Sequence, residues 1–381
     1  MTELTHHFLT SIDQCPAHLW DALAGTDYPF NRHAWLTALE HSGATTANTG
    51  WQPYHLLVEE GGTPALLIPS FIKAHSYGEY VFDWAWADAY QHQGLDYYPK
   101  LISAVPFTPC YGPRILGRWQ EQHVLDYAIT TMKRECERCE LSGWHCLFPD
   151  SEQSTALDSA NLARRTGTQF HWHNRHYRSF DDFVATFTSR KRKNVLKERR
   201  RVAEQGFTFK VLSGQALTEE HWRFFYPLYQ RTYLKLSGHA GYLGQAFFTQ
   251  LGTNMAEHCV MVIASQADKP VAASLMLKDS ETLYGRYWGC LAEFDFLHFE
   301  TCYYQGIDYA IAGGLQRFDG GAQGEHKLAR GFEPIATVSH HWLRDQRFQA
   351  AVDDFLQQET AMVQGYYNDA KEHLPFKHEP A

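Results

Sequence analysis

Two stretches of the chain, far apart in sequence, share one order of apolar runs and polar turns. Residues 54–73 contain two apolar runs around a polar turn that ends in proline, and an aromatic run follows at 79–86. Residues 260–278 repeat this order, and a second aromatic run follows at 281–288. Such runs, rich in β-branched and aromatic residues and bounded by turns, are typical of strands. Each half therefore predicts a meander of three antiparallel strands.

Each meander is followed by residues with the apolar spacing of a helix, first at 121–142 and then at about 299–314. A short apolar run, typical of a strand, comes after each helix, at 144–148 and at 315–318. Repetition of the whole order indicates an internal duplication. The sequence predicts an α/β (α+β) fold of two domains, with mixed, mostly antiparallel sheets flanked by helices.

The join between the repeats is expected near the polar, Ser-rich residues 150–160, which could equally form the first turn of a helix. We expect a first domain at 1–155 and a second at 156–381. Before the second meander the pattern predicts further elements: a strand at 171–178, a long basic helix at 181–204, and helices at 218–236 and 242–257.

Composition is that of a globular protein, because 44% of the 381 residues are hydrophobic, 15% are aromatic and 20% are charged. The net charge of −9 disfavours a surface that binds nucleic acid everywhere. Eight scattered cysteines suit reduced, buried thiols. Neither a signal peptide nor a transmembrane segment is apparent in the pattern, so we expect a cytoplasmic protein.

Basic residues concentrate at 190–201, where eight of twelve side chains are Lys or Arg. A helix with this density of cations would attract RNA or a phosphorylated donor, with an affinity that falls as salt rises. The alternative is a solvated helix whose cations pair with acidic residues elsewhere in the chain.

Residues 318–332 combine four glycines with side chains that move protons or hold anions. Glycine lets the backbone approach a ligand, and Glu325, His326, Lys327 and Arg330 supply a base, a proton carrier and cations. The segment therefore indicates a site held in a turn. The alternative is a helix that begins near Gly324 and spreads these charges over its surface. The segment matches neither of the two common phosphate-binding loops, GxxxxGK[ST] and GxGxxG, which disfavours nucleotide binding.

Other constellations give weaker indications. Cys136, Cys139, His145 and Cys146 are metal-ligand types, but the first two lie near the end of a predicted helix and lack a glycine-containing knuckle between them. His171, His173 and His176 are also ligand types, without a nearby carboxylate. The sequence contains neither a nucleophile elbow nor a recognisable protease cysteine, so we expect direct transfer rather than covalent catalysis.

Two aromatic clusters carry charges that would be costly to bury without partners. The first contains Asp83 beside Trp84 and Trp86, and the second contains Arg286 beside Tyr287 and Trp288. We interpret both as pocket walls.

Several of these segments together resemble a known family. Residues 81–90, 98–101, 104–109, 190–200 and 318–332 are similar, in this order, to signature segments of the FemAB-like family of N-acyltransferases, which is associated with peptidoglycan biosynthesis. The resemblance implies two GNAT-like domains and the transfer of an acyl or aminoacyl group to an amine. Related Fem enzymes take their donor from aminoacyl-tRNA.

The usual acetyl-CoA loop of GNAT enzymes, [RQ]xxGx[GA], has no convincing copy, since Arg164–Gln169 fails at its last position. The donor is therefore expected to be aminoacyl-tRNA or an acyl-CoA, and the acceptor a small amine or a cell-wall precursor. Two other functions stay open: a noncatalytic module that binds cell-wall precursor or RNA, and a zinc-dependent enzyme.

Combining the resemblance with loop chemistry assigns a role to each candidate residue. His326 or Glu325 is the base or positions the amine, and Asp319 orients the acceptor. The donor or oxyanion is held by Lys327, Arg330, Arg286 and the backbone of Gly320, Gly321 and Gly324. The acceptor pocket consists of Asp83, Trp84, Trp86, Tyr287 and Trp288. The polyanion docks on Arg190, Lys191, Arg192, Lys193, Lys197 and Arg200.

Overall fold

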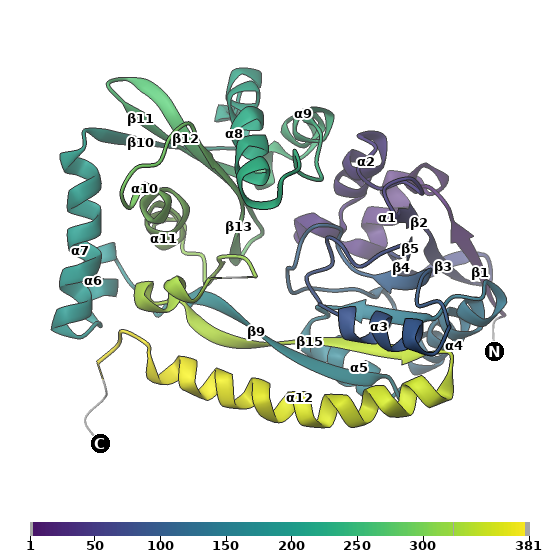
Figure 1. The fold of residues 1–381 in the computed structure, drawn as a ribbon. Coiled ribbons are helices and arrows are strands. Elements are labelled where there is room, and N and C mark those ends of the chain that lie inside the picture. Colours follow the sequence, from purple (N-terminus) through teal and green to yellow (C-terminus); the bar gives the residue numbers. More distant parts are fainter. Residues whose placement is uncertain (1–2, 323, 378–381) are drawn as a thin grey trace. The chain divides into compact units, whose positions relative to one another are not determined.

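The computed structural model describes residues 3–322 and 324–377 and divides into two compact units (Figure 1). Unit 1 comprises Met1–Gly167, Tyr242–Phe247 and Ala336–Gly365, and unit 2 comprises Thr168–Gly241, Phe248–Ile335 and Tyr366–Ala381. Each unit combines strands with helices, which confirms the predicted α/β class. Among the described residues, the helices are too short or too polar to cross a membrane.

Unit 1 contains two sheets. The first has the strand order β1-β3-β4-β7, formed by Leu4–Leu9, His55–Glu60, Thr63–Ile68 and Leu116–Gly117. The second has the order β2-β5-β6-β8-β15, formed by Trp51–Pro53, Phe71–Lys73, Lys100–Ser103, Gly143–Leu147 and Glu333–Leu343. Its helices are α1 (Ala17–Ala24), α2 (His33–His41), α3 (Trp84–His92), α4 (Gln122–Arg138), α5 (Ser151–Asp158) and most of α12 (Gln346–Glu372).

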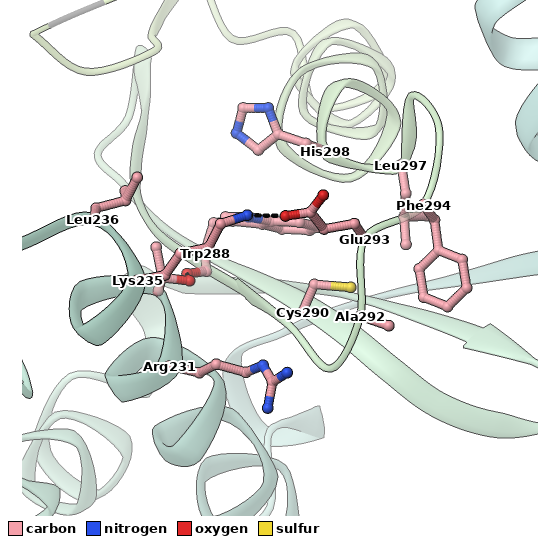
Figure 2. A pocket seen from close by; sticks show the side chains of 11 residues that line it. Arg231, Lys235, Leu236, Trp288, Cys290, Ala292, Glu293, Phe294, Leu297 and His298 are labelled. Atoms are coloured by element: carbon pink, nitrogen blue, oxygen red, sulfur yellow. Dashed lines mark hydrogen bonds and ion pairs between the residues drawn. The ribbon is translucent and has the colours of Figure 1, made fainter.

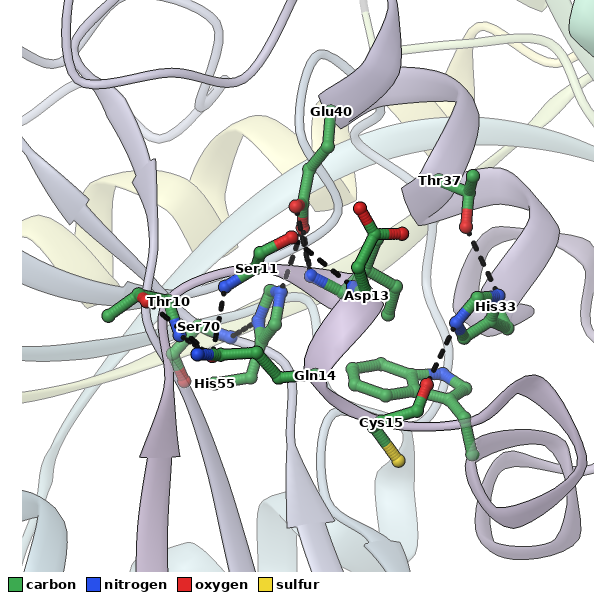
Figure 3. Close-up of polar contacts among 12 residues, drawn as sticks. Thr10, Ser11, Asp13, Gln14, Cys15, His33, Thr37, Glu40, His55 and Ser70 are labelled. Carbon is green, nitrogen blue, oxygen red and sulfur yellow. Dashed lines mark hydrogen bonds and ion pairs between the residues drawn. The ribbon is translucent and has the colours of Figure 1, made fainter.

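Packing of α4 against β3 and β4 forms the main core of unit 1. The amphipathic face of α4 buries Val124, Leu125, Ala128 and Met132. A polar network holds α2 beside this core (Figure 3), where Glu40 accepts hydrogen bonds from the backbone of Ile12. Nδ1 of the buried His55 accepts from the Ser70 backbone, so its Nε2 is protonated and faces Glu40 at 3.3 Å.

One strand of the predicted first meander is wrong. The hairpin β3–β4 forms as expected, although the second predicted strand ends at Ile68 and its last residues form β5 in the other sheet. Residues 79–86 do not form the third strand, because α3 begins at Trp84. Alanines between the aromatic residues favour a helix, and the buried Trp86 and Tyr90 are four residues apart, on one helical face. The polar residues near 150–160 likewise form α5 rather than an open linker.

Unit 2 is built on one sheet with the order β10-β11-β12-β13-β14-β9. These strands are Phe207–Ser213, Cys259–Gln266, Lys269–Lys278, Thr282–Cys290, Arg317–Asp319 and Ala163–His173, of which the residues from Thr168 onward belong to unit 2. The helices are α6 (Phe180–Ala185), α7 (Ser189–Glu204), α8 (Glu219–Ser237), α9 (Gln245–Asn254), α10 (Leu297–Phe299) with a π-helical turn at Glu300–Tyr304, and α11 (Gln305–Ala312). Figure 1 shows α8 and the α10–α11 segment on opposite faces of β12 and β13.

The second meander matches its prediction, since β11, β12 and β13 pair antiparallel. Two other expectations need correction. The predicted basic helix at 181–204 is two helices, because the chain breaks at Thr186–Thr188 and α7 starts anew after Thr188. The strand predicted at 171–178 begins earlier, at Ala163, and ends at His173.

Both units repeat one arrangement that supports the predicted duplication. In unit 1, β6 and β8 are parallel and α4 joins them. In unit 2, β13 and β14 are parallel, and the α10–α11 segment joins them. Parallel neighbours require such a crossover, whereas the other pairs described within each unit are antiparallel.

Candidate active site

The candidate site of unit 2 lies where two parallel strands separate. β13 and β14 pair only at Thr282–Tyr284 and Arg317–Asp319, after which β13 continues to Cys290 and the other chain turns at Gly320. The register of β12 against β13 also shifts, between Leu275 and Met276. A cavity of about 100 Å³ fills this place and is lined in part by Arg286, Trp288, His298, Tyr303 and Gly320.

Three of the sequence-predicted charges come together beside this cavity. Nη2 of Arg286 lies 3.0 Å from Oδ1 of Asp319. Burial works to raise the pKa of Asp319, but Arg286, His171 and the Gly321 N–H lower it to about 2. Lys327 is also buried, and burial lowers its pKa to about 8 despite the Asp319 carboxylate. The Asp319 carboxylate thus compensates the charge of the two buried cations, Arg286 and Lys327.

The glycine turn after β14 requires its glycines for two separate reasons. Gly321 has φ +89°, and its N–H donates to Oδ1 of Asp319 at 2.7 Å, while its carbonyl accepts from Nζ of Lys327 at 2.7 Å. A Cβ atom on Gly320 would stand 2.9 Å from the Phe332 ring and 3.3 Å from Cε of Lys327. The turn is therefore packed as well as bent.

A larger pocket, of about 490 Å³, shares Trp288 and His298 with the cavity (Figure 2). Its volume is in the range that small ligands occupy. Apolar side chains from the end of β13 and the start of α10 line it, and Arg231 and Lys235 of α8 add cations. Lys235 pairs with Glu293, whereas Arg231 forms no ion pair or hydrogen bond within residues 3–322 and 324–377.

His326 and Arg330 belong to a short 3-10 helix, Glu325–Arg330, that begins after Gly324 (φ +112°). Nε2 of His326 lies 2.9 Å from the Tyr303 hydroxyl, and Arg330 donates to Glu198 at 2.8 Å and stacks on Phe299. Partial burial, with Arg330 and Lys327 nearby, lowers the pKa of His326 to about 4. Neither side chain lines the cavity, although Tyr303 connects His326 to it.

The remaining predicted residues are placed differently. Glu325 is exposed and accepts a hydrogen bond from Tyr366 at 2.9 Å. Tyr287 is buried against Tyr229 and lines the cavity, as does Trp288. Asp83, Trp84 and Trp86 belong to unit 1, so the residues predicted for the acceptor pocket divide between the two units.

Asp83 takes part in a buried ionic network within unit 1. Nζ of Lys100 lies 2.5 Å from Asp83 and 2.8 Å from Glu79, and the side chains of all three are at most 3% exposed. Burial raises the pKa of Glu79 to about 7 against the effect of Lys100. For Asp83, Lys100 and His145 overcome burial and lower the pKa to about 2. This network fixes the segment that precedes α3.

The basic helix α7 has two electrostatic halves. Arg199 pairs with Glu300 at 2.9 Å and with Asp308 at 2.7 Å, and Arg200 and Arg201 lie near Glu204. The first half is unpaired: within the described part of the chain, no ion pair or hydrogen bond reaches the side chains of Arg190, Lys191, Arg192, Lys193 and Lys197. Internal pairing therefore does not account for these five cations.

The metal-ligand candidates have other surroundings. The eight cysteines are free thiols, and Cys136 and Cys146 are buried, as the sequence predicts. Cys139 ends α4 beside Glu135 and Tyr54. His171 is buried next to Gln169 and Asp319.

Sequence reasoning missed several residues that line the cavity, among them three with polar or reactive side chains. His298, Tyr303 and Cys302 line the cavity, and all three come from the turns that connect β13 to α11. The sequence could have pointed to them only through their position, because they follow the aromatic strand of the second repeat. Tyr303 and Cys302 read as core residues in a helical pattern, and His298 is an isolated histidine.

Comparison with known proteins agrees with this geometry. Both units have a mixed α/β fold, and in unit 2 two parallel strands separate beside the cavity. A family model described as peptidoglycan biosynthesis/recognition matches residues 11–378, and the chain belongs to this FemAB-like family. Comparison with curated proteins gives no match.

The chain is similar to several solved structures at low sequence identity. The crystal structure of FemX is 10% identical, with a TM-score of 0.54, and the match covers 92% of this chain and 100% of that one. A protein of unknown function from Bacteroides thetaiotaomicron is 11% identical, with a TM-score of 0.49 and coverage of 88% and 98%. The L-PGS structure from Bacillus licheniformis is 10% identical, with a TM-score of 0.47 and coverage of 81% and 90%.

Proposed function

We propose that unit 2 transfers an aminoacyl group from a charged tRNA directly to an amine of a peptidoglycan precursor. The observation that carries this proposal is the set of five unpaired cations between Arg190 and Lys197 of α7. Family membership supports the acceptor class, because the family is described by peptidoglycan biosynthesis or recognition.

The position of these cations on α7 favours a polyanionic ligand. The amino end of a helix carries the positive end of the helix dipole, so cations there are slightly destabilising. Arg190, Lys191, Arg192 and Lys193 occupy this end, and the first turn contains no acidic residue. A phosphate backbone would interact favourably with both the side chains and the helix terminus.

The loop after β13 argues against an acyl-CoA donor held through its phosphates. Residues 291–296 connect β13 to α10 and contain Glu293 and Asp295 but no glycine. Glu293 is neutralised by Lys235, so that this cation is not free for a pyrophosphate, and Asp295 would repel one. The backbone N–H groups also lack the glycine freedom that a phosphate cradle uses. An aminoacyl ester presented by tRNA does not require this cradle.

The hollow offers the groups that the transfer requires. The amine nitrogen attacks the ester carbonyl, and the negative charge on the carbonyl oxygen needs fixed donors. Arg286 and Lys327, supported by Asp319, are the proposed donors, with Gly320 as a backbone contact. His326 and Glu325 are proposed to position the amine. Trp288 and Tyr287 are the proposed wall for the acceptor within unit 2.

Binding of bulk tRNA tests the donor. We expect the logarithm of the binding constant to fall linearly with the logarithm of salt concentration. Replacing Lys193→Glu and Lys197→Glu together is expected to weaken binding at least tenfold and to reduce the slope. The control Lys210→Glu with Lys269→Glu makes the same charge change at exposed positions on β10 and β12 and should behave as the wild type. Equal loss in both variants would contradict a site on α7.

A further inference from the structure

His298 lines both the cavity and the larger pocket of unit 2. It lines the cavity beside Arg286 and Gly320, and it also lines the larger pocket (Figure 2). Its ring packs edge-on against Trp288, with the centroids 5.2 Å apart. A molecule that extends from the pocket into the cavity must therefore pass this imidazole.

The ring nitrogens of His298 are available for proton transfer. Within residues 3–322 and 324–377, neither nitrogen makes a hydrogen bond or an ion pair. Two histidines near the cavity are engaged: His326 with the Tyr303 hydroxyl at 2.9 Å, and His171 with Gln169 at 3.3 Å. A general base needs this freedom, because its lone pair must reach the proton that it removes.

The charged groups around His298 keep it neutral. Burial lowers its pKa to about 4, and His326, Arg330 and Lys327 act in the same direction. The other charged side chains of the pocket are Arg231 and the Lys235–Glu293 pair, so the carboxylate there already has a cation. At neutral pH the imidazole therefore has a free lone pair.

We propose that His298 is the general base of the transfer, an assignment that rests on the proposed function of unit 2. As the amine nitrogen attacks the carbonyl carbon, the new C–N bond forms and the C=O electron pair moves to oxygen. His298 accepts the proton that the nitrogen loses. When the tetrahedral intermediate collapses, the bond to the leaving oxygen breaks and the imidazolium returns the proton to that oxygen.

Two acceptors distinguish a base from a structural residue. The probes are bulk tRNA charged with labelled amino acids as donor, and either L-lysine or hydroxylamine as acceptor. Alkyl amines are protonated at neutral pH, whereas hydroxylamine is largely unprotonated and more nucleophilic, so its attack depends less on a base. The rate of its reaction with the donor in the absence of protein is subtracted. We expect His298→Gln to reduce transfer to lysine by about 10²- to 10⁴-fold and transfer to hydroxylamine by less than about threefold. His373→Gln, on an exposed histidine of unit 2, is the control.

The outcomes are separable. Equal loss with both acceptors, or full retention with lysine, would overturn the role of His298. Restoration of lysine transfer in His298→Ala by added imidazole would support it, even if the substitution lowers stability. A wild-type protein that acylates neither acceptor would contradict the proposed function and, with it, this assignment.

Discussion

Arg286 and Asp319 form an ion pair at 3.0 Å in unit 2, with side chains only 3% and 1% exposed. Removing one member of a buried ion pair is strongly destabilising, because the other charge loses its counter-ion in a site away from water. We expect Asp319→Ala to lower the free energy of unfolding by about 3–5 kcal/mol, as measured by urea denaturation. Asp268→Asn, at an exposed turn with φ 59°, should change it by less than about 0.5 kcal/mol. If both variants lose a similar amount of stability, the buried ion pair does not contribute more to the fold than an exposed aspartate.

Lys327 gives the protein a distinctive alkaline pH dependence. Burial lowers its pKa to about 8 from the model-compound value of 10.5. Between these values the unfolded chain binds more protons than the folded one, so the contribution of Lys327 to stability rises with pH from about 8 to 10.5. In the wild type, Lys327 should raise the free energy of unfolding by up to roughly 3 kcal/mol between pH 8 and pH 10. Lys327→Met should lack this rise when denaturation is measured at the two pH values. If the free energy of unfolding rises between pH 8 and pH 10 as much in the variant as in the wild type, another group causes the pH dependence.

Arg330 is expected to stabilise the fold rather than to hold the donor. Its guanidinium donates to Glu198 of α7 and to the His326 carbonyl. Arg330→Met should therefore destabilise unit 2 by about 1–3 kcal/mol, because Glu198 loses one of its two partners and keeps only the Tyr304 hydroxyl. The salt slope of tRNA binding should stay as in the wild type. A reduced slope without loss of stability would instead favour the role that the sequence predicts.

Two glycines should respond to alanine in opposite directions. Gly320→Ala places a Cβ atom 2.9 Å from the Phe332 ring, and overpacking of this kind costs about 1–3 kcal/mol. Gly365→Ala lies within α12 with nothing inside 4 Å, so it should stabilise by about 0.5–1 kcal/mol. Thermal unfolding of both variants tests the pair, and a neutral Gly320→Ala would show that the turn has room.

The repeat could be predicted because hairpins and crossover helices leave regular patterns. The hairpin β11–β12 has apolar runs around a polar turn, and α4 has clear helical spacing. The pattern at 79–86 predicts a strand wrongly, because aromatic residues suit both strands and helices. Only the alanines and the spacing of Trp86 and Tyr90 favour the helix that forms. The break between α6 and α7 involves Thr186–Thr188, which carry no strong stop signal.

The site was predictable only where its residues are close in sequence. Asp319, Gly320 and Lys327 were found together in one loop, and they lie together in the fold. His298 and Tyr303 could not be assigned, because their access to the cavity depends on where β13 and β14 separate. Local sequence also cannot show that Glu198 engages Arg330, since 132 residues separate them.

The most direct test of the account is transfer itself. The full-length protein would be incubated with tRNA charged with labelled amino acids and with a peptidoglycan-precursor peptide that carries a free amine, and the products analysed by mass spectrometry. We predict a precursor that gains one aminoacyl group through an amide bond, with a yield that falls in the Lys193→Glu, Lys197→Glu variant. Transfer from acyl-CoA but not from charged tRNA, or no transfer from either donor, would contradict the proposed aminoacyl transfer.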